Sequence, residues 1–212
     1  MALAAAVLLV AFPPTRRVLE QAARAGIRAV ADARAAEARE RVVAQYARKY
    51  GISRDMADAI ERAARAERVR TELAFRLVRV ESAFNPRALS PVGAIGLTQL
   101  MLPTARELQP GITRERLYDR DTNLRLGFRY FRSLLRFYGG DVETALHAYN
   151  RGIGTVARIR KAGGDPANGY ARKVLGDPGA SPVGPVSPDT TPITPAAPRV
   201  DELAPVRLPA GM

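Results

Sequence analysis

Apolar residues along much of this chain recur every three to four positions, which is the period of an amphipathic α-helix. Glycine and proline clusters separate these stretches, and no stretch has the pattern of a strand. The sequence therefore predicts an all-α protein with helices over residues 15–49, 53–66, 71–84, 103–109, 121–138, 142–150 and 169–175. Ser53 and Thr71 are expected N-caps, residues 161–165 are expected as loop, and the longest core face should carry Leu124, Phe128, Phe131, Leu134 and Leu135.

One carboxylate interrupts the apolar stripe of the helix that is expected at residues 71–84. At 100° per residue, Glu81 falls between Ala74 and Leu77, with Val78 alongside. Burial disfavours the charged form of a carboxyl group and raises its pKa, which allows a glutamate to donate a proton near neutral pH. The alternative is a glutamate at the rim of the stripe whose carboxylate reaches water or an arginine.

The N-terminal part of the chain has two expected segments. Residues 1–14 form an apolar run that is shorter than the ~20 residues of a membrane-spanning helix. This run resembles the core of a signal peptide, but the first basic residues, Arg16 and Arg17, follow it. The pattern allows an atypical export signal or a membrane-associated segment. Residues 15–49 are rich in alanine, arginine and glutamate and predict a long helix with a weak apolar face, which Gly26 could interrupt.

The C-terminal segment, residues 176–212, has a different composition. Nine of the sixteen prolines lie beyond Asp177. Such a segment favours extended, solvated backbone and cannot assemble a hydrophobic core. We therefore expect a disordered tail or a wall-spanning linker there, with one folded domain over residues 50–175.

Composition narrows the classes of partner. The net charge of +12 favours anionic partners such as cell-wall polymers, membrane surfaces or nucleic acid. Nucleic acid is disfavoured because the arginines are dispersed and no helix-turn-helix, zinc or stacking-aromatic motif accompanies them. The chain has no cysteine, so it has neither disulfides nor a zinc-type cysteine cluster.

Three separated motifs carry the main chemical signal. They are Glu81-Ser82, the loop Gly96-Leu-Thr-Gln-Leu-Met101, and Ala148-Tyr-Asn150 at an expected helix end. In this order they resemble the catalytic domain of the soluble lytic transglycosylases, which belong to the lysozyme-like superfamily. The resemblance covers about residues 50–175. It implies a lysozyme-like helical domain that cleaves peptidoglycan strands with neither cofactor nor metal.

The resemblance also implies a mechanism. Glu81 would protonate the glycosidic oxygen between N-acetylmuramic acid and N-acetylglucosamine, and would then act as a base toward the muramic 6-hydroxyl, which closes a 1,6-anhydro ring. One carboxyl group is sufficient for this reaction, whereas most glycosidases need a pair. Asp119, Asp121 and Asp141 could supply a second acid, but helix capping and surface turns explain them better.

The family pattern assigns further residues to the sugar-binding groove, beside or near Glu81: Ser90, Gln99, Met101, Tyr149 and Asn150. Taken alone, Ser90 could be an ordinary turn serine before Pro91, and Met101 and Tyr149 would more often be core residues. Tyr170 matches a family tyrosine more weakly. Thr98 departs from the family by replacing its usual methionine, which should alter the groove wall.

Two alternatives stay open beside the transglycosylase. A hydrolytic muramidase of goose-lysozyme type would use the same fold and the same acid. A non-catalytic wall-binding or secretion-apparatus scaffold would not need the motif residues that are intact here. The single histidine, His147, is interpreted as a packing or helix-surface residue. The expected location is the periplasm or the extracellular side of the cell envelope, with a membrane-associated form allowed by the N-terminal run.

Overall fold

The computed structural model describes residues 16–176 of the chain. The expectations for residues 1–14 and for the proline-rich tail beyond Gly176 lie outside the described residues. The chain divides into two compact units, Met1–Gly51 and Ile52–Met212, and each is described by itself.

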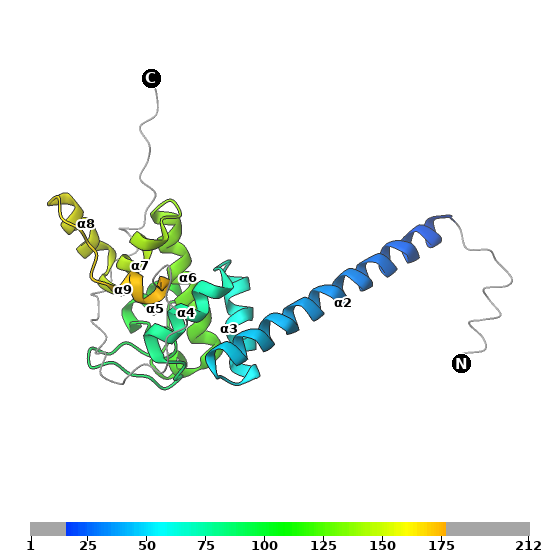
Figure 1. Cartoon of the computed structure of the whole chain (residues 1–212), viewed down its shortest axis with the longest axis horizontal. Helices are drawn as coiled ribbons and strands as arrows, with labels where there is room; N and C mark the ends of the chain where they lie inside the picture. The colour runs from blue at the N-terminus through cyan, green and yellow to red at the C-terminus, as the bar shows by residue number, and fades with distance from the viewer. Residues whose placement is uncertain (1–15, 177–212) are drawn as a thin grey trace, which may run out of the picture. The chain divides into compact units, whose positions relative to one another are not determined.

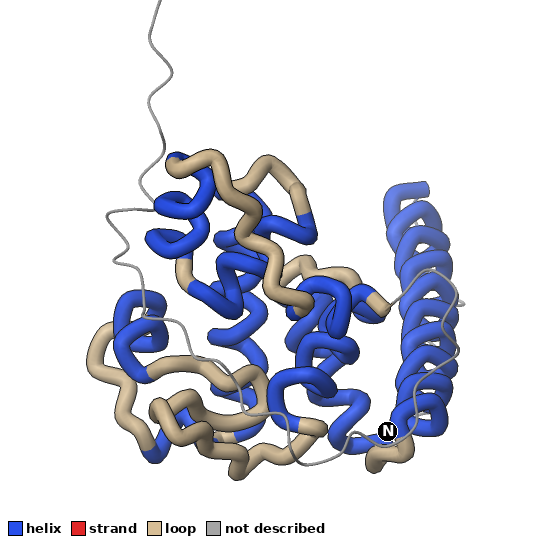
Figure 2. Tube along the Cα trace, turned by 60° about the vertical axis from the view of Figure 1, so that its left-hand side comes forward, coloured by secondary structure: helices blue, strands red, loops and turns tan. Residues whose placement is uncertain are grey.

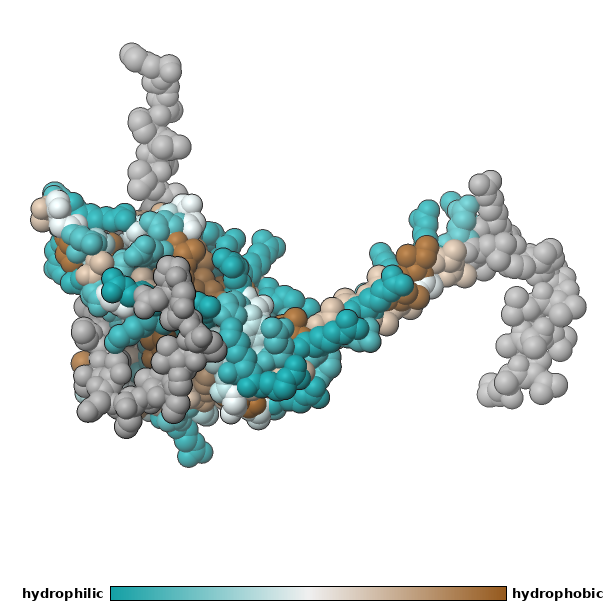
Figure 3. All heavy atoms as spheres, in the orientation of Figure 1, coloured by the Kyte–Doolittle hydropathy of each residue, from teal (hydrophilic) through white to brown (hydrophobic). Residues whose placement is uncertain are grey.

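The first unit contains the helix α2, Arg16–Tyr50, drawn in blue in Figure 1. The predicted interruption at Gly26 is wrong, because the helix continues through this residue without a break. All side chains from residue 20 to residue 38 are exposed, as expected for a face that consists mostly of alanine. The surface of α2 is mostly hydrophilic or weakly hydrophobic (Figure 3), and the large apolar side chains that it exposes are Ile27 and Val30.

The second unit contains the remaining helices of the described chain: α3 Arg54–Ala66, α4 Thr71–Ser82, α5 Leu102–Leu108, the 3₁₀ helix η1 Glu115–Tyr118, α6 Arg120–Phe137, α7 Val142–Arg151, α8 Ile153–Lys161 and α9 Tyr170–Leu175. Figure 2 shows helices and loops without a strand among the described residues, which contain only isolated bridges. The predicted all-α class is confirmed for the described residues, including the helical N-terminal extension.

The long helix α6 organises the core of the second unit. It contacts α3, α5, η1 and α7, while α9 packs against α4 and α7. The predicted core face of α6 is confirmed, since all five of its expected residues are buried: Leu124, Phe128, Phe131, Leu134 and Leu135.

Side-chain caps set several helix starts. Ser53 Oγ accepts a hydrogen bond from the Met56 amide at the start of α3, as predicted. Asp119 and Asp141 cap α6 and α7 in the same way. The expectation for Thr71 is wrong, because Arg70 occupies the N-cap position of α4 and Thr71 is the first helical residue.

The sequence interpretation missed α8 as well as η1. Gly152 ends α7 and also stands at the N-cap of α8, with φ 81°. A positive φ favours glycine, and here it turns the chain within one residue so that a second helix starts at once. The glycines at this junction therefore connect α7 to α8. In the sequence they indicated only the end of a helix.

No helix within residues 16–176 has both the length and the apolar composition needed to cross a membrane.

Candidate active site

Glu81 lies in the last turn of α4, next to the buried face of that helix. Leu77 and Val78, one turn earlier, are fully buried, and the Glu81 side chain is half-buried. Enclosure of the carboxyl group by the surrounding protein raises the pKa of Glu81 from 4.5 to about 7. A large fraction of Glu81 is therefore protonated near neutral pH, which is the state that a general acid needs.

The backbone turns sharply directly after this acid. Ala83 and Phe84 both adopt left-handed conformations, with φ 48° and 64°, which non-glycine residues rarely occupy. Ser82 ties the same helix end to the next loop, because its hydroxyl lies 2.9 Å from the Leu97 carbonyl oxygen and can donate to it. The end of α4 is thus held in an unusual conformation that positions Glu81 against the loop of residues 83–101.

Tyr170 makes the direct side-chain contact to the acid. This tyrosine is the first residue of α9, is buried, and donates a hydrogen bond from its hydroxyl to Glu81 Oε1. The bond favours the charged carboxylate and lowers the pKa of Glu81, but the effect of burial is larger. The sequence shows only a weak correspondence between Tyr170 and a family tyrosine, so it did not predict this contact with Glu81.

Tyr149 lies near Glu81, but its hydroxyl donates its hydrogen bond to a different residue. Its hydroxyl donates to the Thr98 carbonyl oxygen at 2.8 Å, and its ring packs against Tyr130 and Phe131 with centroid distances of 5.4 and 5.8 Å. Burial and the neighbouring charge of Glu81 raise the pKa of Tyr149 well above its usual value. Tyr149 is therefore a neutral phenol that fixes the loop beside the acid.

A buried asparagine supports this loop from α6. Asn123 Oδ1 accepts a hydrogen bond from the Thr98 amide at 2.9 Å, and Asn123 Nδ2 donates to the carbonyls of Ile95 and Leu117. Thr98 is fully buried against Gly127, where an added Cβ would lie 2.2 Å from the Thr98 hydroxyl oxygen. The expectation that Thr98 forms part of the groove wall is therefore wrong, because its side chain faces α6.

Asn150 is linked to the acid through two intervening residues. Asn150 Oδ1 accepts a hydrogen bond from Asn168 Nδ2 at 2.8 Å, and Asn168 Oδ1 accepts one from the Tyr170 amide at 3.2 Å. These bonds hold the start of α9, from which Tyr170 reaches Glu81. The sequence did not single out Asn168; its position just before the Gly169-Tyr170 start of a helix was the available signal.

The other residues assigned to the sugar groove lie in the loop between α4 and α5. Ser90 is buried, and its hydroxyl accepts a hydrogen bond from the Ala94 amide at 2.9 Å, as a turn serine does. Gln99 adopts φ 46° and its amide donates to the Gly96 carbonyl. Met101 is half-buried at the N-cap of α5. Their roles toward a glycan stay predictions.

The aspartates that were considered as second acids have other roles. Asp119 and Asp141 cap helices, and hydrogen bonds from Thr122 and Thr144 hold the pKa of each carboxyl below its usual range. Asp121 is exposed and pairs with Arg120. Residues 16–176 contain no group of three or more side chains suited to hold a metal ion. His147 is buried in α7, which agrees with a packing role.

Known proteins resemble this chain in the same region. The family model described as "Transglycosylase SLT domain" matches residues 58–169, a little over half of the chain. The soluble lytic murein transglycosylase of Escherichia coli (strain K12) is 33% identical over 105 residues, which cover 47% of this chain and 16% of that protein. The transglycosylase of Enterobacteria phage PRD1 is 47% identical over 76 residues, which cover 36% of this chain and 27% of that protein.

The fold of the matched region also resembles that of a solved structure. The complex of the 70-kDa soluble lytic transglycosylase with bulgecin A matches with a TM-score of 0.50 and 30% sequence identity, over 56% of this chain and 22% of that chain. The chain spans 16% and 27% of the length of the two curated relatives. The likeness is thus confined to one domain, which contains Glu81, Tyr149 and the loop between α4 and α5. On the extent of the family match, the chain belongs to the transglycosylase SLT domain family.

Proposed function

We propose that this protein is a peptidoglycan lytic transglycosylase that cleaves the β-1,4 bond between N-acetylmuramic acid and N-acetylglucosamine. The observation that carries the proposal is Glu81, a carboxyl group with a pKa of about 7 that receives a hydrogen bond from a buried tyrosine. The relatives named as lytic murein transglycosylases support the choice of substrate. The proposed location is the cell envelope, where this polymer lies.

In the proposed reaction, Glu81 first gives its proton to the glycosidic oxygen as the bond to the muramic C1 breaks. N-Acetylglucosamine leaves with a free 4-hydroxyl group. The Glu81 carboxylate then takes the proton of the muramic 6-hydroxyl, whose oxygen forms the new bond to C1. Glu81 ends protonated as it began, and no water is consumed.

The surroundings of Glu81 favour this intramolecular route over hydrolysis. The causes of its raised pKa include no second carboxylate among the described residues. A muramidase needs a group that activates water, whereas the 6-hydroxyl of the substrate is already held near C1 and has a high effective molarity. Tyr170 would keep the Glu81 carboxyl oriented between its two roles. Ser90, Gln99, Met101 and Asn150 are proposed to contact the glycan, and Tyr149 to orient the groove beside it.

The test is mass spectrometry of the fragments that the purified protein releases from peptidoglycan. We expect glycan ends that carry 1,6-anhydromuramic acid, each lighter by one water than a reducing end. Reducing muramic ends would show that the protein is a hydrolytic muramidase, with Glu81 still the acid. A folded protein that releases no fragments would favour the non-catalytic wall-binding scaffold.

A further inference from the structure

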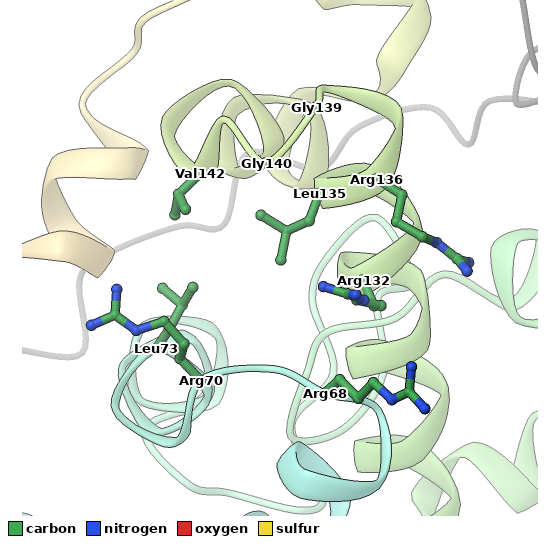
Figure 4. Close-up of a pocket in the computed structure, with 9 residues that line it drawn as sticks. All are labelled: Arg68, Arg70, Leu73, Arg132, Leu135, Arg136, Gly139, Gly140 and Val142. Atoms are coloured by element: carbon green, nitrogen blue, oxygen red, sulfur yellow. The ribbon is translucent and has the colours of Figure 1, made fainter.

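A pocket of about 390 Å³ lies at the end of α4 that is remote from Glu81. It is formed within the second unit by the turn before α4, the first turn of α4, the last turns of α6 and the start of α7 (Figure 4). Its lining consists of arginines, glycines and aliphatic residues: Arg68, Arg70, Leu73, Arg132, Leu135, Arg136, Gly139, Gly140 and Val142. Along α4, Leu73 and Glu81 are separated by roughly 12 Å at the helical rise per residue, so the two sites are distinct.

The lining combines an apolar centre with a cationic rim. Figure 4 shows Leu73, Leu135 and Val142 facing the open space from three different helices, and the Arg132 guanidinium extending into it from α6. No acidic residue lines the pocket. A ligand that fills it would therefore meet aliphatic side chains on one part of its surface and positive charge on another.

The four arginines of this pocket make no ion pair with an acidic side chain of residues 16–176, although their neighbours do. Arg129 pairs with Glu67 at 3.0 Å, and Arg76 pairs with Glu72 at 2.6 Å. Glu67 and Glu72, which precede the lining residues Arg68 and Leu73 in the sequence, are thus already paired with other arginines. The pocket is left with an unbalanced positive charge, which an anion would neutralise.

Two of these arginines stand where the fold disfavours them. Arg68 adopts φ 56°, a left-handed conformation in which glycine or asparagine is usual. Arg70 occupies the N-cap of α4 without a side-chain cap, at the positive end of the helix dipole. Local stability alone would select other residues at both positions, so a ligand that needs these charges is the better explanation.

We propose that this pocket binds a phosphate ester that carries an apolar substituent. The planar guanidinium group matches phosphate oxygens with paired hydrogen bonds, and several arginines together suit a phosphate better than a single carboxylate. The aliphatic centre gives the apolar substituent a place beside the charged rim. The same phosphate could come from a lipid headgroup or from a free phosphate ion, and the test separates these two sources.

The experiment uses the full chain and titrates it by calorimetry and by methyl NMR with dihexanoylphosphatidylglycerol below its micelle concentration. We expect saturable binding and shifts at the methyl groups of Leu73, Leu135 and Val142. Dihexanoylphosphatidylcholine keeps the phosphodiester but adds a choline cation, which the arginines of the lining would repel, so it should bind more weakly than the anionic lipid. Inorganic phosphate that binds as tightly as the lipid would identify a free phosphate ion as the source.

Arg132→Ala combined with Arg136→Ala tests the assignment to this pocket. Alanine favours helix, so α6 should form normally, and binding should weaken by about 100-fold. The matched control, Arg158→Ala combined with Lys161→Ala, removes the same charge from α8 and should leave binding unchanged. Absence of saturable binding by either phosphate compound, or equal weakening in both double variants, would overturn the proposal. Binding by Glu81→Gln should equal that of the wild type, so this result is independent of the proposed catalysis.

Discussion

The charged side chains at the two ends of α4 differ in burial and in hydrogen bonding. At the C-terminal end, Glu81 is enclosed, and Tyr170 donates a hydrogen bond to it. At the N-terminal end, Arg68 and Arg70 are exposed and have no acidic partner within the described part of the chain. Both ends are unfavourable for the isolated fold, one through burial of a carboxyl group and the other through backbone and dipole effects.

The roles of the charged side chains at the two ends of α4 need different measurements. Enclosure shifts the pKa of an acid and so controls a reaction rate, which makes kinetics the test at Glu81. The contribution of the exposed arginines appears in ligand binding and in the free energy of unfolding.

Glu81→Gln should reduce peptidoglycan cleavage by about 10²–10⁴-fold, the usual contribution of a general acid. The amide is nearly isosteric and can accept the Tyr170 hydroxyl, but it cannot donate the proton. The matched control is Glu72→Gln, which makes the same chemical change in the first turn of α4, where Glu72 pairs with Arg76. The measurement is the rate of soluble fragment release by proteins with equal helical circular dichroism. A similar loss of cleavage rate in both variants would contradict a specific catalytic role of Glu81.

The same Glu81→Gln variant should be more stable than the wild type at pH 8. Because the pKa of Glu81 is raised in the folded state from 4.5 to about 7, its stabilising contribution is complete below pH 4.5 and is lost as the pH rises through about 7. The full displacement corresponds to about 3 kcal/mol, and the partial exposure of the side chain reduces the expected gain to about 1–2 kcal/mol.

Urea unfolding at pH 4 and pH 8 measures this effect. The difference in free energy of unfolding between variant and wild type should be near zero at pH 4 and should appear at pH 8. A gain of equal size at both values would mean that the substitution acts through packing, with no part played by the titration of Glu81.

Tyr170→Phe should slow cleavage by about tenfold and change its pH dependence. The rate of an enzyme with Glu81 as general acid should fall above pH 7, as the carboxyl loses its proton. The hydroxyl of Tyr170 lowers the pKa of Glu81, so its removal should move this falling limb to higher pH. Tyr149→Phe, which removes a bond to the Thr98 carbonyl, should shift the limb less. Identical pH profiles for the two variants would contradict a direct role of Tyr170.

Much of the fold was predictable because local chemistry determines it. Ser53 caps α3 and the apolar face of α6 is buried, as their patterns predict. The helix α8 was missed because Gly152 gives the same signal whether a helix ends or another begins directly after it. The backbone φ of 81° at this residue, which permits the restart, is a property of the folded chain.

The site was predictable where a short motif contains it. Glu81 and Tyr149 stand inside such motifs, whereas the support from Asn123 depends on contacts with Ile95 and Leu117 that only folding creates. The arginine pocket could not be predicted at all. Arg68 and Arg132 are far apart in a sequence with abundant arginine, and only the folded chain places both of them in the lining of one pocket.

Arg70→Ser should give the smallest effect, a gain of about 0.5–1 kcal/mol in the free energy of unfolding. Serine at the N-cap can accept a hydrogen bond from an amide in the first turn of α4, and the substitution removes a cation from the positive end of the helix dipole. Arg70→Ala removes the same charge without supplying a cap, so it should gain less than Arg70→Ser.

Urea unfolding at pH 7 compares the three proteins, and phosphatidylglycerol titration follows on each. If Arg70 binds the phosphate and destabilises the folded protein, both variants should bind the lipid more weakly. Their free energies of unfolding should be no lower than that of the wild type. A stabilised variant that retains full binding would show that Arg70 does not contact the phosphate. A destabilised variant would show that Arg70 supports the fold, and the contrast between the two ends of α4 would then rest on Arg68 and the arginines of α6.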